Sequence, residues 1–210
     1  MNKPATLRFA PVFLSAALTL CSGSQASDVG MTINSGTGFA FWDAFPGANF
    51  SNDAPDTSAG LTSPVLGLAS GGLLTGSGSR IYDFGSAAAW TAAGSASFGI
   101  TGFELQVKNY QYSTESLTSL FAPTLNGLAF DSVNVNFVTE GANTQEIVTW
   151  SWSGSLASSP SNAFSVALSE PGAHISIDAL AIRAIPEPSA SFLLLGGTAV
   201  LAAGRRRRRN

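Results

Sequence analysis

The sequence predicts an all-β body, an antiparallel sandwich of two sheets with a jelly-roll or immunoglobulin-like topology. Only 11% of the 210 residues are charged, less than half the ~25% typical of soluble domains, so long surface helices are not expected. Short runs of alternating apolar and polar residues recur along the chain, as in half-buried strands. Gly, Asn, Ser and Pro separate these runs. The chain lacks the amphipathic crossover helices that a parallel sheet requires.

The alternating runs indicate where the strands lie and where they are irregular. The run 103–108 has the opposite phase to Phe98 and Ile100, so one residue must be absorbed between them, and Gly102 is the predicted β-bulge. The run 174–183 also changes phase, which predicts a strand that is bulged or buried on both faces. Residues 113–121 could form a short helix. Further strands are expected in 130–137, 148–152 and 164–168.

The N-terminus has the three parts of a secretory signal. Lys3 and Arg8 precede an apolar run over residues 9–20, and small residues follow at positions −3 and −1 of a cleavage site after Ala26. We therefore expect signal peptidase to remove residues 1–26, so that the mature chain begins at Ser27. The single cysteine lies before this site, so the mature protein would contain no disulfide.

The C-terminus combines a proline motif, an apolar run and a basic end. Pro186, Glu187 and Pro188 are followed by an uncharged stretch over residues 190–204. As a helix this stretch would be ~22 Å long, shorter than the ~30 Å hydrocarbon core, so it suits a temporary anchor better than a permanent one. An ordinary single-span anchor is the alternative, but it does not explain the proline motif. The basic end would stay in the cytoplasm and consists of Arg205, Arg206, Arg207, Arg208 and Arg209.

These three parts, in this order, resemble the PEP-CTERM sorting signal of Gram-negative bacteria that make exopolysaccharide. The resemblance is confined to residues 185–210. It implies that an exosortase, a membrane-embedded protease, removes the tail. The body, residues 27–184, would first be held at the inner membrane on its periplasmic side and then be delivered to the outer surface or extracellular matrix.

Composition and motifs argue against nucleic-acid binding and catalysis. Between Ser27 and Ala184 the chain has three basic and twelve acidic residues, a net charge of −9, which repels phosphate backbones. The only histidine, His174, lies four residues before Asp178, a separation of ~13 Å along a strand and too long for a catalytic hydrogen bond. No catalytic residue is assigned, because nothing in the sequence pairs the candidate glycosidase carboxylates, which are Glu104, Glu115, Asp131, Glu140 and Glu146.

Two binding sites are considered, for calcium and for sugar. No His/Cys cluster suggests a transition metal, and no cofactor is expected, but the oxygen-rich segment 52–56 could bind structural calcium. Local turn formation is the alternative for such residues. A glycan platform could form from Trp150 and Trp152 or from Tyr110 and Tyr112, because each pair would share a strand face ~7 Å apart. For the Trp pair core packing is the preferred interpretation, because tryptophans that share a strand face more often lie in a core.

The sequence therefore predicts a non-catalytic structural protein of the cell surface or matrix, associated with exopolysaccharide. The alternative is a carbohydrate-binding module. A secreted hydrolase is a weaker third hypothesis.

Overall fold

The computed structural model describes residues 29–45, 50–70, 73–75, 80–82, 88–110, 116–153, 156, 161–170 and 175–186. The predicted signal peptide, and the sorting tail beyond Pro186, lie outside these residues. In the part of the chain that the structure describes, no helix is long and apolar enough to cross a membrane.

Most of the described residues lie in β-strands, and a single short helix, α1 (Leu117–Leu120), falls within the predicted segment 113–121. The all-β class and the antiparallel pairing predicted from the sequence are confirmed. The strands are β1 (Phe39–Trp42), β2 (Thr57–Ala59), β3 (Leu61–Ser70), β4 (Leu73–Thr75), β5 (Arg80–Tyr82), β6 (Ala88–Tyr110), β7 (Thr124–Leu125), β8 (Leu128–Ala129), β9 (Ser132–Glu140), β10 (Asn143–Trp152), β11 (Ser161–Glu170) and β12 (Ser176–Pro186).

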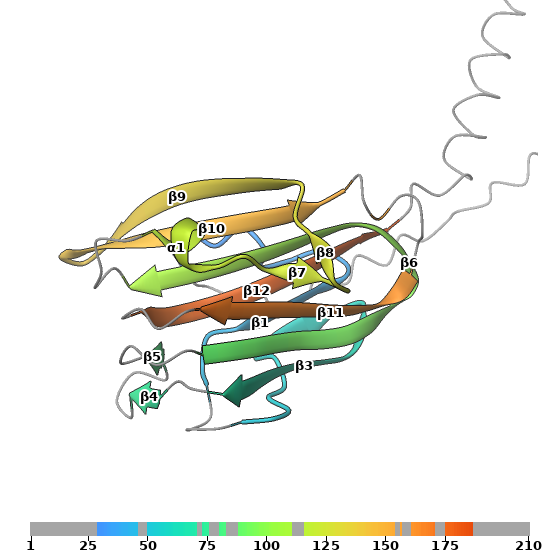
Figure 1. Cartoon of the computed structure of the whole chain (residues 1–210), viewed down its shortest axis with the longest axis horizontal. Helices are drawn as coiled ribbons and strands as arrows, with labels where there is room; N and C mark the ends of the chain where they lie inside the picture. The colour runs from blue at the N-terminus through green and yellow to red at the C-terminus, as the bar shows by residue number, and fades with distance from the viewer. Residues whose placement is uncertain are drawn as a thin grey trace, which may run out of the picture.

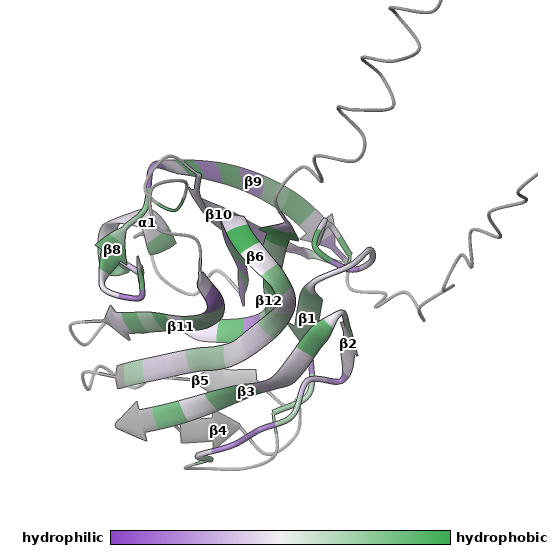
Figure 2. Ribbon diagram, turned by 90° about the vertical axis from the view of Figure 1, so that its right-hand side faces the viewer, coloured by the Kyte–Doolittle hydropathy of each residue, from purple (hydrophilic) through white to green (hydrophobic). Residues whose placement is uncertain are grey.

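The 23-residue strand β6 organises the sheet. Its first half pairs with β3 and β11, and its second half pairs with β10 and β12. The prediction of two separate sheets is therefore corrected: the described strands form one twelve-stranded antiparallel sheet. The reason is that β6 runs on through the irregularity near Gly102 instead of ending in a turn. We call the strands paired with the first half of β6 and those paired with its second half the two arms of the sheet. The sheet curls so that these two arms enclose a common interior (Figure 1, Figure 2).

Both phase changes in the sequence correspond to irregular pairing. Against β12, Gly102 pairs with Ile185 and Ile100 pairs with Pro186, which leaves Thr101 as the extra residue. In β12 the register shifts between Ile177 and Ala179. Each bulge reverses which side chains of the strand point inward, as the change of phase in the sequence predicts.

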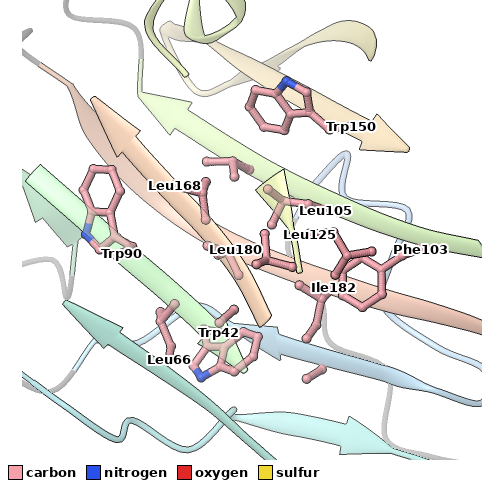
Figure 3. Close-up of a cluster of buried hydrophobic side chains, with 14 of the residues drawn as sticks. Trp42, Leu66, Trp90, Phe103, Leu105, Leu125, Trp150, Leu168, Leu180 and Ile182 are labelled. Atoms are coloured by element: carbon pink, nitrogen blue, oxygen red, sulfur yellow. The ribbon is translucent and has the colours of Figure 1, made fainter. Parts of the chain in front are cut away.

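The main core lies between the two arms of the sheet. Its largest members are four tryptophans, none of which is more than 1% exposed: Trp42, Trp90, Trp150 and Trp152. Figure 3 shows this cluster gathering side chains from β1, β3, β6, β7, β10, β11 and β12. Aromatic rings contact one another within it; Phe103 and Trp152 meet edge to face, with ring centroids 6.1 Å apart.

A second, smaller core covers the opposite face of the β12 arm. Met31 and Ile33, from the segment before β1, pack there against Phe41, Ile147 and Ala179. The backbone N–H groups of Thr32 and Ile33 donate to Oε1 of the buried Gln106 at 2.8 and 3.2 Å, which fixes the covering segment on the sheet. Strand β12 is consequently buried on both faces.

Strand β9 lies at the margin of the sheet, along the outer side of β10 (Figure 1). Its apolar residues alternate as the sequence predicts, but they are exposed: Val133 by 43%, Val135 by 39% and Phe137 by 55%. In the described part of the chain β9 pairs with β10 alone.

Candidate functional site

The most unusual polar feature of the body is a lysine with no solvent exposure. Lys108 lies in the second half of β6, with its side chain on the face of the small core, and its Nζ is 2.9 Å from Glu140 Oε2 and 3.6 Å from Asp178 Oδ2. Glu140 comes from the end of β9 and Asp178 from β12. Three strands therefore contribute to one buried ionic cluster, the Lys108 cluster.

Backbone irregularity positions Asp178 in this cluster. Ile177 belongs to the main core and Ala179 to the small core, and Asp178 is the extra residue at the bulge between them. Its Oδ2 also accepts a hydrogen bond from Gln145 Nε2 at 3.4 Å. The bulge thus lets an acid in a strand buried on both faces reach the lysine.

The Lys108 cluster stabilises a buried charge; it does not present a reactive group. Glu140 is 47% exposed and Asp178 14%, while Lys108 is fully enclosed. An ammonium group removed from water requires paired carboxylates. The cluster therefore holds β9 and β12 to β6 and leaves its amine inaccessible to a substrate.

The other described carboxylates that were candidates for glycoside cleavage serve separate structural contacts. Glu146, 1% exposed, accepts from the backbone N–H of Leu117 at 2.9 Å and so caps the start of α1. Glu104 pairs with Arg183 across β6 and β12. Asp131 Oδ2 accepts from the Ser153 backbone N–H at 2.5 Å. These carboxylates do not converge on a common cleft, and Glu115 lies outside the described residues.

The tryptophans proposed as a glycan platform belong to the core. Trp150 is 0% and Trp152 1% exposed, and the Trp152 indole N–H donates to the Leu128 carbonyl at 3.1 Å. Their shared strand face is the covered one, so the platform interpretation is wrong for this pair. Tyr110 is half-buried, and its hydroxyl accepts a hydrogen bond from Asn143 Nδ2. Tyr112 lies outside the described residues.

The oxygen-rich segment 52–56 makes turn contacts. Asp53 exchanges backbone hydrogen bonds with Leu66, and Asp56 Oδ2 accepts from the backbone N–H groups of Asp43 and Ala44 at 2.9 and 3.1 Å. Burial, and secondarily the neighbouring Asp56, raises the pKa of Asp53. Within the described ranges no group of three or more His, Cys, Asp or Glu side chains could hold a metal ion. Structural calcium stays a prediction from the sequence.

A cavity of about 10 Å³ lies between Ile100, Leu125 and Phe164, room for about one water molecule. It is separate from the Lys108 cluster and too small for a sugar.

The remaining sequence-based sites lie outside the described residues: Ala26, Ser27, His174, Glu187, Pro188 and Arg205 to Arg209. Pro186 is described, and it is an exposed residue at the end of β12. The Lys108 cluster, by contrast, was missed by sequence reasoning. A lone lysine in an alternating strand gives only a weak signal, because its acidic partners lie in two distant segments.

Neither a family model nor a curated protein sequence matches this chain. Among solved structures, the chain is similar to the major pilin SpaA of Corynebacterium diphtheriae, with 20% sequence identity and a TM-score of 0.31. The match covers 56% of this chain and 29% of the pilin. Similarity at this level assigns no function to the chain.

Proposed function

We propose that this chain is an exported, non-catalytic structural protein of the cell surface or extracellular matrix, sorted by its C-terminal PEP-CTERM-like tail. The observation that supports the proposal is the exposure of Pro186, the first residue of the motif, at the end of the last strand. Strand β12 is buried through Ala184, whereas Ile185 and Pro186 are exposed. A protease could therefore reach the chain at Pro186 without unfolding the body.

The body itself favours a structural role. Its buried polar side chains hold strands together: Lys108 holds β9 and β12 to β6, Gln106 holds the segment before β1, and Glu146 caps α1. The low charge and the abundance of Gly, Ser, Thr and Asn suit a module embedded in a hydrated matrix.

The sorting proposal is tested in the native host by tail variants. Glu187→Ala, or deletion of Arg205 to Arg209, should leave uncleaved protein in the membrane fraction, while the control Asn210→Ala, which retains the motif and all five arginines, should be processed normally. Mass spectrometry of the mature surface protein should find no peptide from residues 192–204. Surface protein that still carries those residues would overturn the proposal.

The non-catalytic role is tested separately on the purified protein. We expect no turnover of matrix polysaccharide. Hydrolysis that is lost when one carboxylate is replaced would refute the role. Pull-down with the host's exopolysaccharide tests the alternative role as a carbohydrate-binding module. Because Trp150 and Trp152 are buried, saturable binding would have to use a different surface.

A further inference from the structure

Strand β9 exposes an apolar stripe, formed by Val133, Val135 and Phe137, that is 39–55% exposed. The register with β10 defines the face on which this stripe lies. Val133 pairs with Trp150 and Val135 with Val148, and directly opposed residues on antiparallel strands share a face. Trp150 and Val148 belong to the main core. The stripe therefore lies on the same face of the sheet as the main core, outside the part of that face that is covered.

Alternate backbone groups of β9 also face outward, away from β10. The Phe137 N–H donates to the side-chain Oδ1 of Asn136 at 3.0 Å, so this amide points away from β10. Backbone groups alternate along a strand, which places those of Val133 and Val135 on the same outer side. Natural edge strands are commonly protected by proline, lysine or a bulge. Strand β9 contains no proline or lysine, and its nine pairs with β10 run without a register shift.

We infer that β9 pairs edge to edge and antiparallel with β9 of a second copy of this chain, about a two-fold axis at Val135. The strand sequence is self-complementary in this register. Val133 opposes Phe137 of the other copy, and Asn134 opposes Asn136, so the two apolar stripes form one continuous surface and the asparagines meet on the other face. The sheet then extends across both molecules through an isologous contact.

Charge is compatible with a second copy as the occupant. The only charged residue of β9 is Glu140, which is held by Lys108 within its own copy. In the proposed register Glu140 opposes Phe130 of the other copy, so no like charges are directly opposed. The body as a whole is strongly acidic, and the two copies repel at long range. Screening by salt should therefore strengthen the association, whereas a basic partner would bind more weakly in salt.

The exposed area indicates a weak contact. The three stripe side chains expose on the order of 200 Å² per copy, well below the ~800 Å² per partner of a standard stable interface. Backbone pairing adds hydrogen bonds but not a large apolar area. We expect a dissociation constant on the order of 0.1 mM, so that the contact forms where copies are crowded and dissociates in dilute solution. The inference does not depend on the sorting tail.

The test compares charge insertion at two equally exposed apolar residues of the full chain in mild detergent. Val135 and Leu128 are both 39% exposed, and Leu128 lies in β8, outside the proposed contact. Sedimentation velocity up to ~0.5 mM should show a monomer–dimer equilibrium. Val135→Lys should weaken it at least tenfold, whereas Leu128→Lys should change it by less than about twofold. Val135→Pro provides a second variant, because it removes an outward N–H that the β10 ladder does not use.

Cross-linking tests the register. In a Cys21→Ser background, Val135→Cys should form a self-linked dimer at the two-fold axis. Val133→Cys should not link to itself but should link to Phe137→Cys in a mixture. Monomer throughout the concentration range overturns the inference, as does a dimer indifferent to Val135→Lys and Val135→Pro. A dimer lost only on removal of residues 187–210 would assign the contact to the tail, and capture of a different protein's strand without self-pairing would equally refute it.

Discussion

The Lys108 cluster predicts that removing Asp178, its more buried acidic partner, costs more stability than removing the lysine itself. Lys108 has no exposure, whereas Glu140 is 47% and Asp178 14% exposed. An ammonium group that cannot reach water depends on its carboxylates. Without the lysine the carboxylates are still stabilised, since Glu140 can turn to solvent and Asp178 accepts a hydrogen bond from Gln145.

The distances give the expected sizes. At an effective dielectric constant of about 20, unit charges at the 3.6 Å between Lys108 Nζ and Asp178 Oδ2 interact by about 5 kcal/mol. Local relaxation, together with the remaining pair with Glu140, reduces the loss for Asp178→Asn to about 2–4 kcal/mol. Glu140→Gln should cost about 1 kcal/mol, because water screens that carboxylate. Lys108→Met removes the buried charge while preserving much of the volume, and should cost no more than about 2 kcal/mol.

Urea unfolding of the full chain at neutral pH, followed by fluorescence of the four buried tryptophans, measures these losses. The double variant Lys108→Met with Asp178→Asn should be no less stable than Asp178→Asn alone, because it no longer contains the ammonium group that Asp178→Asn leaves without its buried carboxylate. If Lys108→Met destabilised the protein more than Asp178→Asn, the argument would be refuted. The lysine would then contribute mainly through packing of its stem.

Three further predictions concern the backbone, a buried acid and the tryptophans. Gly38→Ala should cost several times as much stability as its control Gly127→Ala, measured by urea unfolding; both have φ near +80°, but a Cβ at Gly38 would lie 2.5 Å from a backbone oxygen and one at Gly127 meets nothing within 4 Å. Equal losses would contradict the steric argument. Burial raises the folded-state pKa of Asp53 above its ordinary value of 3.8, so its contribution to stability falls as pH rises from that value through the raised pKa. Asp53→Asn should therefore raise the melting temperature relative to wild type at pH 7 but not at pH 3, and an equal gain at both would refute this. Trp152→Phe should be about 1–2 kcal/mol more destabilising than Trp150→Phe in the same urea assay, because of these two indoles only that of Trp152 donates a described hydrogen bond. The reverse order would refute this reasoning.

Local pattern was enough to predict strands within β6, β9, β10, β11 and β12 and the irregularities of β6 and β12, but it did not predict β1 to β5, β7 or β8. The opposite phases of Ile100 and the run 103–108 correspond to the extra residue Thr101. The phase change after Ile177 corresponds to the bulge at Asp178. Both follow from the period of two in a strand, which requires an extra residue wherever the apolar face switches sides.

The same local pattern could not predict what covers each face. Val133 and Val135 alternate with polar residues just as Val148 and Trp150 do, yet β9 is exposed and the paired residues of β10 are buried. Position in the sheet makes the difference, and position depends on contacts between distant segments. For Trp150 and Trp152 the sequence left both core packing and a glycan platform open, and their burial shows that they belong to the core.

The sequence by itself determined the all-β class, the antiparallel pairing and the phase of the long strands β9 to β12 and of the second half of β6, because these depend on composition and on alternation between neighbours. It also supplies the sorting hypothesis, which rests on short contiguous motifs. Only the tertiary structure decided that β6 joins both arms into one sheet, that Lys108 meets Glu140 and Asp178, and that β9 exposes its apolar stripe and pairs, among the described strands, with β10 alone. Each of these is a long-range contact, and its energy depends on which distant surfaces exclude water from it.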